Sequence, residues 1–280
     1  MKEPTFTIHH LLEAGVHFGH HPRRWNPKMA PFIYGVRNKV HILDLRKTVP
    51  MLHAALKAIT ETVSQGGRVL FVATKRQAAH KVAEAAKACG QYYVNHRWLG
   101  GTLTNWQTIS QSIKRLEELQ AKLSPEGSAG LTKKESLKMT REKQKLDLAL
   151  GGIASMGGRP DLVVVFDTDK EALAVEEAYK LGIPVVGIID TNSCPDKITF
   201  PIPGNDDASR SIDLYCKLFV EAVVAGLRAE ITDSSADLGA AEEVAEPVLE
   251  DVKEMLADVP AELVEAVVEA AEAAIPSEEA

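Results

Sequence analysis

Short apolar runs rich in β-branched residues alternate along this chain with segments whose apolar residues recur at helical spacing. The runs predict strands near residues 40–45, 68–74, 92–95, 162–167, 184–190 and 198–202. Strands that alternate with helical segments are typical of a parallel sheet joined by crossover helices. The pattern therefore predicts an α/β protein.

The helical segments carry their own start and stop signals. Residues 49–63 hold apolar side chains at helical spacing, with Thr48 as the expected cap, Pro50 in the first turn and Gly66 after the end. Further helices are predicted at about residues 75–89, 170–181 and 206–229. Asp206 and Asp207 open the last of these, because acidic residues suit a helix N-terminus.

One insertion, residues 104–150, lacks strand character and predicts a two-helix hairpin with a turn at residues 124–127. Its first arm has an apolar seam formed by Trp106, Ile109, Ile113, Leu116 and Leu123. The second arm opens with Thr132 and Glu135 in a capping-box pattern and carries six basic residues, Lys133 and Lys134 among them. This charge is typical both of a solvated helix face and of an RNA contact, and the sequence favours neither.

Length and composition fit one large domain with appendages. The chain has 280 residues, 45% of them hydrophobic, and its apolar runs fall far short of the roughly 20 residues that cross a bilayer. His9, His10 and Glu13 interrupt the stretch in which an export signal would be apolar. The three cysteines lack metal or disulfide spacing. We therefore expect a cytoplasmic protein without a membrane segment.

The net charge of −7 hides a division along the chain. Residues 231–280 contain 15 acidic residues and one basic residue, so residues 1–230 carry a net charge of +7. The first hundred residues hold 15 Lys and Arg against five Asp and Glu, and all nine histidines. A cationic surface attracts polyanions, above all nucleic acid. We predict a basic core over residues 1–230 and an acidic extension over 231–280 that is disordered or loosely helical.

Residues 20–47 concentrate cations among aromatic side chains. Trp25, Phe32 and Tyr34 are interleaved with prolines, which we expect to hold the segment extended, and with Arg23, Arg24, Lys28, Arg37, Lys39, Arg46 and Lys47. Guanidinium groups grip phosphates, and exposed aromatic rings stack on unpaired bases. We expect at least two of the three aromatic residues to pack in the core, which leaves the basic residues as the RNA contacts.

Two other chemistries are weighed against RNA binding. His17, His20 and His21 are spaced closely enough to bind zinc, but without a neighbouring cysteine or carboxylate they are weak candidates, and hydrogen-bonding or phosphate-facing histidines are the alternative. We therefore predict no cofactor and keep zinc as an alternative.

The second chemistry is a nucleotide-dependent enzyme with Asp167, Asp190 and Cys194 near its active edge. The chain lacks both common phosphate-binding glycine motifs. Its glycine-rich segment, with pairs at residues 151–152 and 157–158, comes before a strand and not after one, and we interpret it as a flexible joint between hairpin and sheet.

Several separated sequence blocks resemble those of a known family. They are GVHFGH at 15–20, WNPKM at 25–29, ILDLRKT at 42–48, NHRWLGGTLTN at 95–105, PDLVVVFD at 160–167, GIPVVGIIDTN at 182–192, IPGNDDA at 202–208 and RSI at 210–212. In this order and spacing they resemble a bacterial-type member of the S-two family of small-subunit ribosomal proteins. The resemblance spans residues 5–229 and leaves the acidic extension unmatched, so we expect that extension to project away from RNA.

The resemblance implies a flavodoxin-like, doubly wound parallel sheet of about five strands that bears an α-helical hairpin. It implies a structural constituent of the small ribosomal subunit, without catalytic activity, that contacts ribosomal RNA between head and body on the solvent side. It also implies other ribosomal proteins as partners, with support for recruitment of the S-one protein, and neither DNA nor membrane. The candidate RNA-binding residues are Arg23, Arg24, Lys28, Arg37, Lys39, Arg46, Lys75, Arg76, Arg97, Trp98, Lys133 and Lys134.

Overall fold

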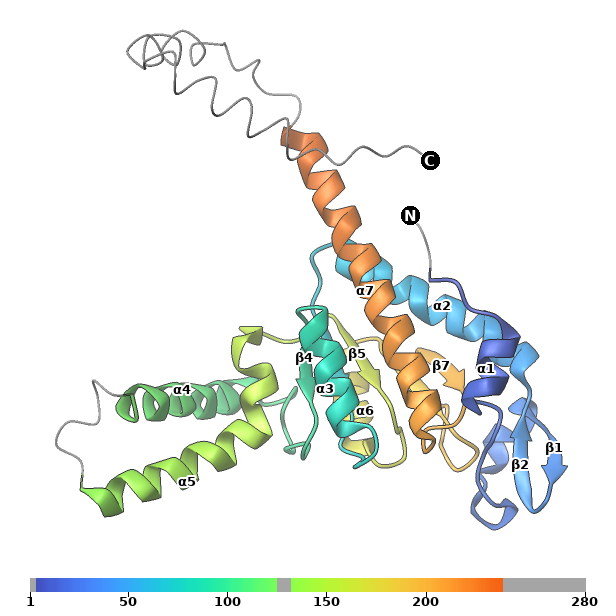
Figure 1. Cartoon of the computed structure of the whole chain (residues 1–280), viewed down its shortest axis with the longest axis horizontal. Coiled ribbons are helices and arrows are strands. Elements are labelled where there is room, and N and C mark those ends of the chain that lie inside the picture. Colours follow the sequence, from blue (N-terminus) through green and yellow to red (C-terminus); the bar gives the residue numbers. More distant parts are fainter. Residues whose placement is uncertain (1–3, 125–131, 239–280) are drawn as a thin grey trace, which may run out of the picture. The chain divides into compact units, whose positions relative to one another are not determined.

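The computed structural model describes residues 4–124 and 132–238, with side chains described up to residue 232 (Figure 1). The chain divides into two units, Met1–Ser234 and Ser235–Ala280, and the fold below is that of the first unit. The acidic extension predicted for residues 231–280 lies for the most part outside the described residues.

A five-stranded parallel sheet forms the centre of the protein. Its strands are β3 (Val69–Val72), β4 (Tyr92–Val94), β5 (Leu162–Val165), β6 (Val185–Ile189) and β7 (Phe200–Pro203), in the spatial order β4-β3-β5-β6-β7. All four neighbouring pairs are parallel. The first of these strands in sequence lies second in space, which is the flavodoxin-like order. The predicted fold class is confirmed.

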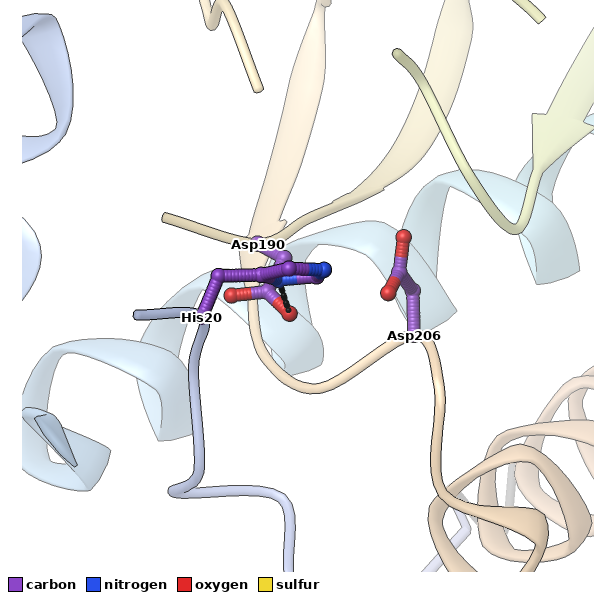
Figure 2. A group of neighbouring side chains, drawn as sticks. All are labelled: His20, Asp190 and Asp206. Atoms are coloured by element: carbon purple, nitrogen blue, oxygen red, sulfur yellow. Dashed lines mark hydrogen bonds and ion pairs between the residues drawn. The ribbon is translucent and has the colours of Figure 1, made fainter. Parts of the chain in front are cut away.

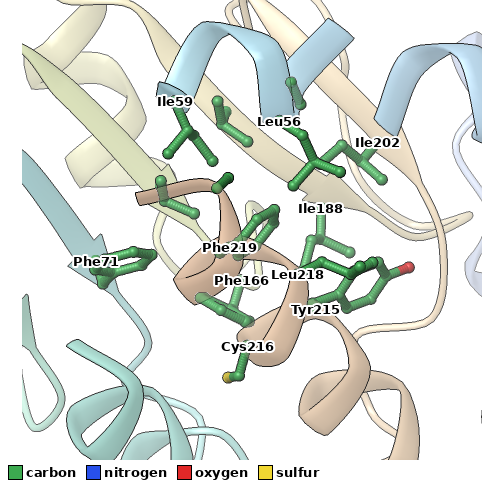
Figure 3. Packing of buried hydrophobic residues seen from close by; sticks show 14 of the residues in the cluster. Leu56, Ile59, Phe71, Phe166, Ile188, Ile202, Tyr215, Cys216, Leu218 and Phe219 are labelled. Carbon is green, nitrogen blue, oxygen red and sulfur yellow. The ribbon is translucent and has the colours of Figure 1, made fainter. Parts of the chain in front are cut away.

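Helices cover both faces of the sheet, so the strands are buried on both sides, as their continuous apolar runs predict. One face packs against α1 (Ile8–Ala14), α2 (Leu45–Ser64), α3 (Ala79–Ala88) and α7 (Ser209–Leu238). On this face the rings of Phe166 and Phe219 meet edge to face with centroids 5.7 Å apart (Figure 3). The opposite face packs against α6 (Ala172–Leu181), the first turns of α4 (Trp106–Lys122) and the 3-10 helix η3 (Gly151–Met156).

The inserted hairpin consists of α4 and α5 (Lys133–Leu150), as predicted. Ile109, Ile113 and Leu116 are buried along its seam, and the Arg115 guanidinium binds the Glu142 carboxylate between the arms at 3.1 Å. The capping box of Thr132 and Glu135 is confirmed. Most of the predicted turn at residues 124–127 lies outside the described residues.

The glycine pair after the hairpin does not form the flexible joint that we predicted. Gly151 and Gly152 open η3, which packs against β4. A Cβ atom added at Gly152 would overlap the carbonyl oxygen of Tyr93 and lie 2.8 Å from its ring. The pair is therefore a site of close packing, where a side chain at residue 152 would separate η3 from the sheet.

The helix predicted over residues 49–63 is α2, which begins earlier than predicted, at Leu45. The Asp44 side chain caps α2 by accepting a hydrogen bond from the Arg46 amide at 3.1 Å, so Thr48 lies inside the helix. The Thr48 hydroxyl instead donates to the carbonyl of Pro203 at 2.8 Å. The prediction of Thr48 as the cap is wrong because Asp44 offers an equally suitable side chain one turn earlier.

Residues 22–43 also differ from the predictions. The prolines begin two short 3-10 helices, η1 (Pro22–Arg24) and η2 (Pro27–Phe32), and do not hold the segment extended, because the fixed φ of proline suits a first helical position. The predicted strand near residues 40–45 is β2 (Val40–Leu43), which pairs antiparallel with β1 (Ile33–Arg37) outside the parallel sheet. Neither β1 nor α1 was predicted.

The C-terminal helix α7 continues to Leu238, beyond the predicted end at residue 229. No described helix combines the length and the apolar content needed to span a membrane. All three cysteines are free thiols, of which Cys89 and Cys216 are buried and Cys194 is exposed.

Candidate nucleic-acid interface

The predicted cations of residues 20–47 lie on the surface. Arg23 and Arg24 are exposed on η1, and Arg37 and Lys39 flank the tip of the β1–β2 hairpin. Asn38 and Lys39 have left-handed backbone conformations, with φ of 52° and 63°, which produce the tight turn between the strands. Arg23, Arg24, Arg37 and Lys39 make no ion pair within the described residues, so their charges are available to a ligand.

Two further cations of this segment are exposed but paired. The Lys28 ammonium binds the Asp196 carboxylate, and the Arg46 guanidinium binds both carboxylate oxygens of Asp44 at 3.0 and 3.2 Å. Arg46 also lies over the Tyr34 ring, 5.9 Å from its centroid. Surface pairs of this kind are weak, so a phosphate group can compete for the same cations.

The aromatic side chains are more exposed than predicted. Only Phe32 packs against the core, whereas Trp25 is exposed and Tyr34 is 72% exposed. The prediction that at least two of them would be buried is wrong. Tyr34 lies on β1, in a separate hairpin with one solvent-facing side, and Trp25 follows the short helix η1 at the surface. Trp25 and Tyr34 therefore offer exposed planar surfaces among the cations.

Trp98 has a supporting position below the surface. It is 7% exposed, and its indole N–H donates to the Glu177 carboxylate at 3.1 Å. The same carboxylate accepts hydrogen bonds from the amides of Gly101 at 2.8 Å, Leu103 at 3.0 Å and Thr104 at 3.2 Å. Glu177 thus fixes the segment that carries Arg97, and this geometry favours a structural role for Trp98 over an RNA contact.

Glu177 keeps its charge despite being buried. Burial alone would raise the pKa of its carboxyl, but hydrogen bonds from Gly101, Trp98, Leu103 and Thr104 hold the pKa below its usual value. The carboxylate is therefore ionised at neutral pH and accepts strong, charge-assisted hydrogen bonds.

Arg97 and His96 are exposed beside a pocket of about 410 Å³ at the carboxyl edge of the sheet. The pocket is also lined by Thr74, Trp98, Lys170, Glu171 and Leu173. The Lys170 ammonium donates to the Thr74 carbonyl at 2.9 Å. Arg76, likewise exposed, lies in the turn after β3 at the same edge. This edge therefore carries a second group of exposed cations.

Lys75 differs from its neighbour Arg76. Its ammonium lies 3.3 Å from the Asp167 carboxylate and 3.0 Å from that of Asp206, and it also pairs with Asp207. Burial alone would lower the pKa of Lys75, but its hydrogen bonds to Asp207 and Asp206 and the charge of Asp167 raise it. Because this cation is already engaged by three carboxylates, the geometry favours a structural role over an RNA contact.

The same carboxylates oppose nucleotide binding. In a flavodoxin-like sheet, ligands bind where the strand order reverses, which here lies between the carboxyl ends of β3 and β5. Lys75 and Asp167 fill this position. Burial, together with the negative charges of Asp167 and Asp190, raises the pKa of Asp206 to about 7. Several carboxylates therefore lie close together at this position. Such a site repels phosphate groups.

The three candidate metal-binding histidines do not come together. His21 accepts a hydrogen bond from the Arg23 amide, and His17 has a buried Nδ1 without a partner in the described residues. His20 instead lies close to Asp190 and Asp206 (Figure 2), and its Nε2 is 3.3 Å from Asp207 Oδ2. Its Nδ1 is 2.7 Å from Asp190 Oδ2, and this hydrogen bond raises the pKa of His20 against the effect of burial.

Lys133 and Lys134 are exposed in the first turn of α5. Neither makes an ion pair within the part of the chain that the structure describes. Cations at this end of a helix oppose the helix dipole, so their position is mildly unfavourable for the helix itself. The exposed position is compatible with both interpretations, a solvated helix face and an RNA contact.

Sequence reasoning missed two groups of residues. Glu177 lies between buried Ala174 and Ala178 on the inner face of a helix, and a lone carboxylate on such a face is the signal that could have identified it. The cluster of His20, Asp190 and Asp206 joins residues distant in sequence. The sequence feature that could have identified this cluster is that Asp190 and Asp206 each follow a strand of the parallel sheet, and the carboxyl ends of parallel strands meet at one edge.

Comparison with known proteins gives consistent matches. The family model of Ribosomal protein S2 matches residues 11–226. The small ribosomal subunit protein uS2 of Rhodospirillum centenum is 64% identical over 249 residues, which cover 89% of this chain and 95% of the relative. The proteins of the same name from Gluconobacter oxydans and Rhodospirillum rubrum are 64% and 59% identical, over 87% and 89% of this chain and 92% and 95% of their own lengths.

The fold is an α/β scaffold, and the sequence has no phosphate-binding glycine motif. The matches place the chain in the class of ribosomal proteins, which are structural proteins and not enzymes. More particularly, the chain belongs to the ribosomal protein S2 family. The resemblance drawn from the sequence blocks is confirmed, and membership implies a cytoplasmic, ribosome-associated location.

Proposed function

We propose that this chain binds ribosomal RNA of the small subunit at the head–body junction, on the solvent side, and that it supports recruitment of the S-one protein. The observation that carries the RNA contact is the exposure of Arg23, Arg24, Arg37 and Lys39, none of them paired within the described residues. Relatives named small ribosomal subunit proteins support the assignment.

The binding mechanism is neutralisation of phosphates on a rigid scaffold. Each phosphate contact by Lys or Arg releases counterions, so the RNA affinity falls steeply as salt rises. Arg76 and Arg97 at the sheet edge, with Lys133 and Lys134 on α5, extend the contact surface. Because side chains cannot read the deep groove of an RNA helix, we expect recognition of shape with little base specificity.

Loss of the exposed cations should change the salt dependence of RNA binding. The slope of log K against log [salt] is negative. Replacing Arg23 and Arg24 with glutamine in the full-length protein should make this slope less steep, by about one unit for each lost phosphate contact. Affinity should fall for all RNA sequences alike. Filter binding to small-subunit ribosomal RNA across a salt series measures both quantities.

The matched control is Lys57→Gln with Lys217→Gln, which removes the same charge from exposed positions on α2 and α7. This control should leave the slope close to that of the unmodified protein. Equal slopes for the arginine variant and the control would show that the effect is one of net charge, and the contact at Arg23 and Arg24 would be rejected.

The S-one part of the proposal concerns an exposed apolar patch beside the cations. The patch comprises Ile8, Leu12, Phe18, Tyr34 and Val36, which are all exposed. They line two pockets, of about 650 and 230 Å³, that share His17, Tyr34 and Ile42. Contiguous exposed apolar surface marks sites of protein association, whereas it attracts no phosphate. We therefore assign the patch to the protein partner.

A charge within the patch should block recruitment. Leu12→Asp should reduce S-one bound to purified small subunits at least fivefold, because an isolated carboxylate would have to be buried at the interface. Incorporation of the variant itself into subunits should be unchanged. Sedimentation through a sucrose gradient, with both proteins quantified by antibody, measures the two effects separately.

Tyr179→Asp, at an exposed position on α6, is the control and should retain S-one. If Leu12→Asp subunits bound S-one as well as the control does, the patch would not be the recruiting surface.

A further inference from the structure

We propose that His20, Asp190 and Asp206 form a binding site for one divalent transition-metal ion of the zinc class. The three side chains come from three segments, which are the loop before η1, the end of β6 and the loop between β7 and α7. Figure 2 shows the imidazole ring of His20 beside the Asp190 carboxylate, to which it is hydrogen-bonded, with Asp206 nearby.

The distances suit a single ion. One ligand atom from each residue lies within 4.8 Å of the other two. Ligand atoms around a tetrahedral zinc ion lie about 3.3–3.5 Å apart, given metal–ligand bonds of about 2.0–2.2 Å. The side chains therefore need to close by little more than about 1 Å. One imidazole with carboxylate oxygens is a donor set that zinc accepts, whereas calcium and magnesium prefer oxygen alone.

The charges of the cluster are unbalanced without a further cation. Among the described residues, the Lys75 ammonium pairs with Asp167, Asp206 and Asp207, and the His20 imidazole pairs with Asp190 and Asp207. Four carboxylates therefore share one ammonium and one imidazole. Asp190 and Asp206 are each 1% exposed, so water screens them poorly. A divalent ion would supply the charge that this group lacks.

Two buried polar atoms provide an independent indication. Oδ2 of Asp206 is buried and has no hydrogen-bond partner among the described residues, although the other oxygen of this carboxylate is held by Lys75 at 3.0 Å. The fully buried hydroxyl of Tyr215 is also without a partner among the described residues. Burial, together with the charges of Asp190 and Asp206, raises the pKa of this hydroxyl. Buried unpaired atoms of this kind are rare in proteins and mark sites for an ion or water.

The bound ion would have a structural role. His20 immediately precedes the basic segment, and its amide already donates to the Thr191 hydroxyl at 2.9 Å. A metal bridging His20 to Asp190 and Asp206 would fix that segment to the edge of the sheet. Binding to the folded state alone would also stabilise the protein in proportion to the logarithm of the metal concentration.

The test uses full-length protein stripped with a chelator and titrated with zinc chloride by calorimetry, with cobalt chloride as a spectroscopic probe. We expect one equivalent of zinc and a visible cobalt absorption band. His20→Asn should weaken zinc affinity at least tenfold, because it removes the imidazole ligand of the site. His21→Asn is the matched control and should bind as the unmodified protein does.

Less than half an equivalent of bound zinc, or equal affinity in His20→Asn and His21→Asn, would overturn the proposal. A second variant keeps the test decisive if His20→Asn does not fold. Lys75→Gln removes the cation that competes for Asp206, so it should bind zinc more tightly. Weaker binding or none in Lys75→Gln, in a protein that remains folded by circular dichroism, would also contradict the site.

Discussion

Replacing Glu177 with glutamine should lower the free energy of unfolding by about 3–5 kcal/mol. The carboxylate receives hydrogen bonds from the Trp98 indole, three backbone amides and the Thr104 hydroxyl, and it is buried. A glutamine of the same shape would turn an N–H group toward these donors and leave several of them unpaired. Urea unfolding followed by fluorescence measures the loss.

The neighbouring residue provides the control. Glu176 is exposed and pairs with Lys197 at the surface, so Glu176→Gln should change stability by no more than about 0.5 kcal/mol. Similar losses in both variants would show that the charge of α6 matters and that the hydrogen bonds of Glu177 do not.

The effect of Glu177 should also depend on pH. Its pKa is lowered from the ordinary 4.5, so the ionised form is favoured by folding and its contribution is complete above that value. The stability difference between the native protein and Glu177→Gln should therefore shrink as the pH falls below about 4.5. A difference that stays constant down to pH values near 3 would contradict this account.

The second large effect is expected at Gly152, where alanine should cost about 3 kcal/mol or more, at the upper end of overpacking effects. The added methyl group would overlap the Tyr93 carbonyl oxygen, which belongs to the backbone of β4 and cannot move without disturbing the sheet. Thermal and urea unfolding of the full-length variant measure the effect.

Gly151→Ala is the matched control for this substitution. Its methyl group would meet only the flexible Asp147 side chain, at 2.8 Å, and its backbone is already helical. Stability should be unchanged or slightly higher, since alanine favours a helical backbone. Equal costs at residues 151 and 152 would disprove close packing of η3 against β4 as the cause.

Some parts of the fold could be predicted because their cause is local. Strands buried on both faces must be apolar throughout, so β3, β5 and β6 are visible as continuous runs. The start of α2 could not be predicted, because Asp44 and Thr48 are both good caps and only the pairing of β2 decides between them. Proline suits both an extended chain and a first helical position, so the 3-10 helices that begin at Pro22 and Pro27 could not be predicted from the prolines alone. Contacts distant in sequence, such as the bond from the Asn26 amide to the Thr191 carbonyl at 2.7 Å, also hold this segment.

In the candidate site, too, only the features with a local cause could be predicted from the sequence. Composition alone predicts a basic surface, and Arg23, Arg24 and Arg37 lie on it. Composition does not reveal that Trp98 is buried and Lys75 half-buried while Arg76 and Arg97 are exposed. Burial is decided by partners from other segments, Glu177 for Trp98 and Asp206 for Lys75. Neither partner is adjacent in sequence to the residue that it holds.

The loop around His20 has a consequence for the order in which the protein is made. Gly15 and Val16 are hydrogen-bonded to Asn205, and His20 is bonded to Asp190, 170 positions later in the chain. At synthesis rates of about 5–20 residues per second, the N-terminal segment waits on the order of ten to forty seconds for these partners. Its cations therefore reach their final arrangement only when nearly the whole core has left the translating ribosome. A nascent chain would have the charge to attract RNA well before it has the shape to bind its own site.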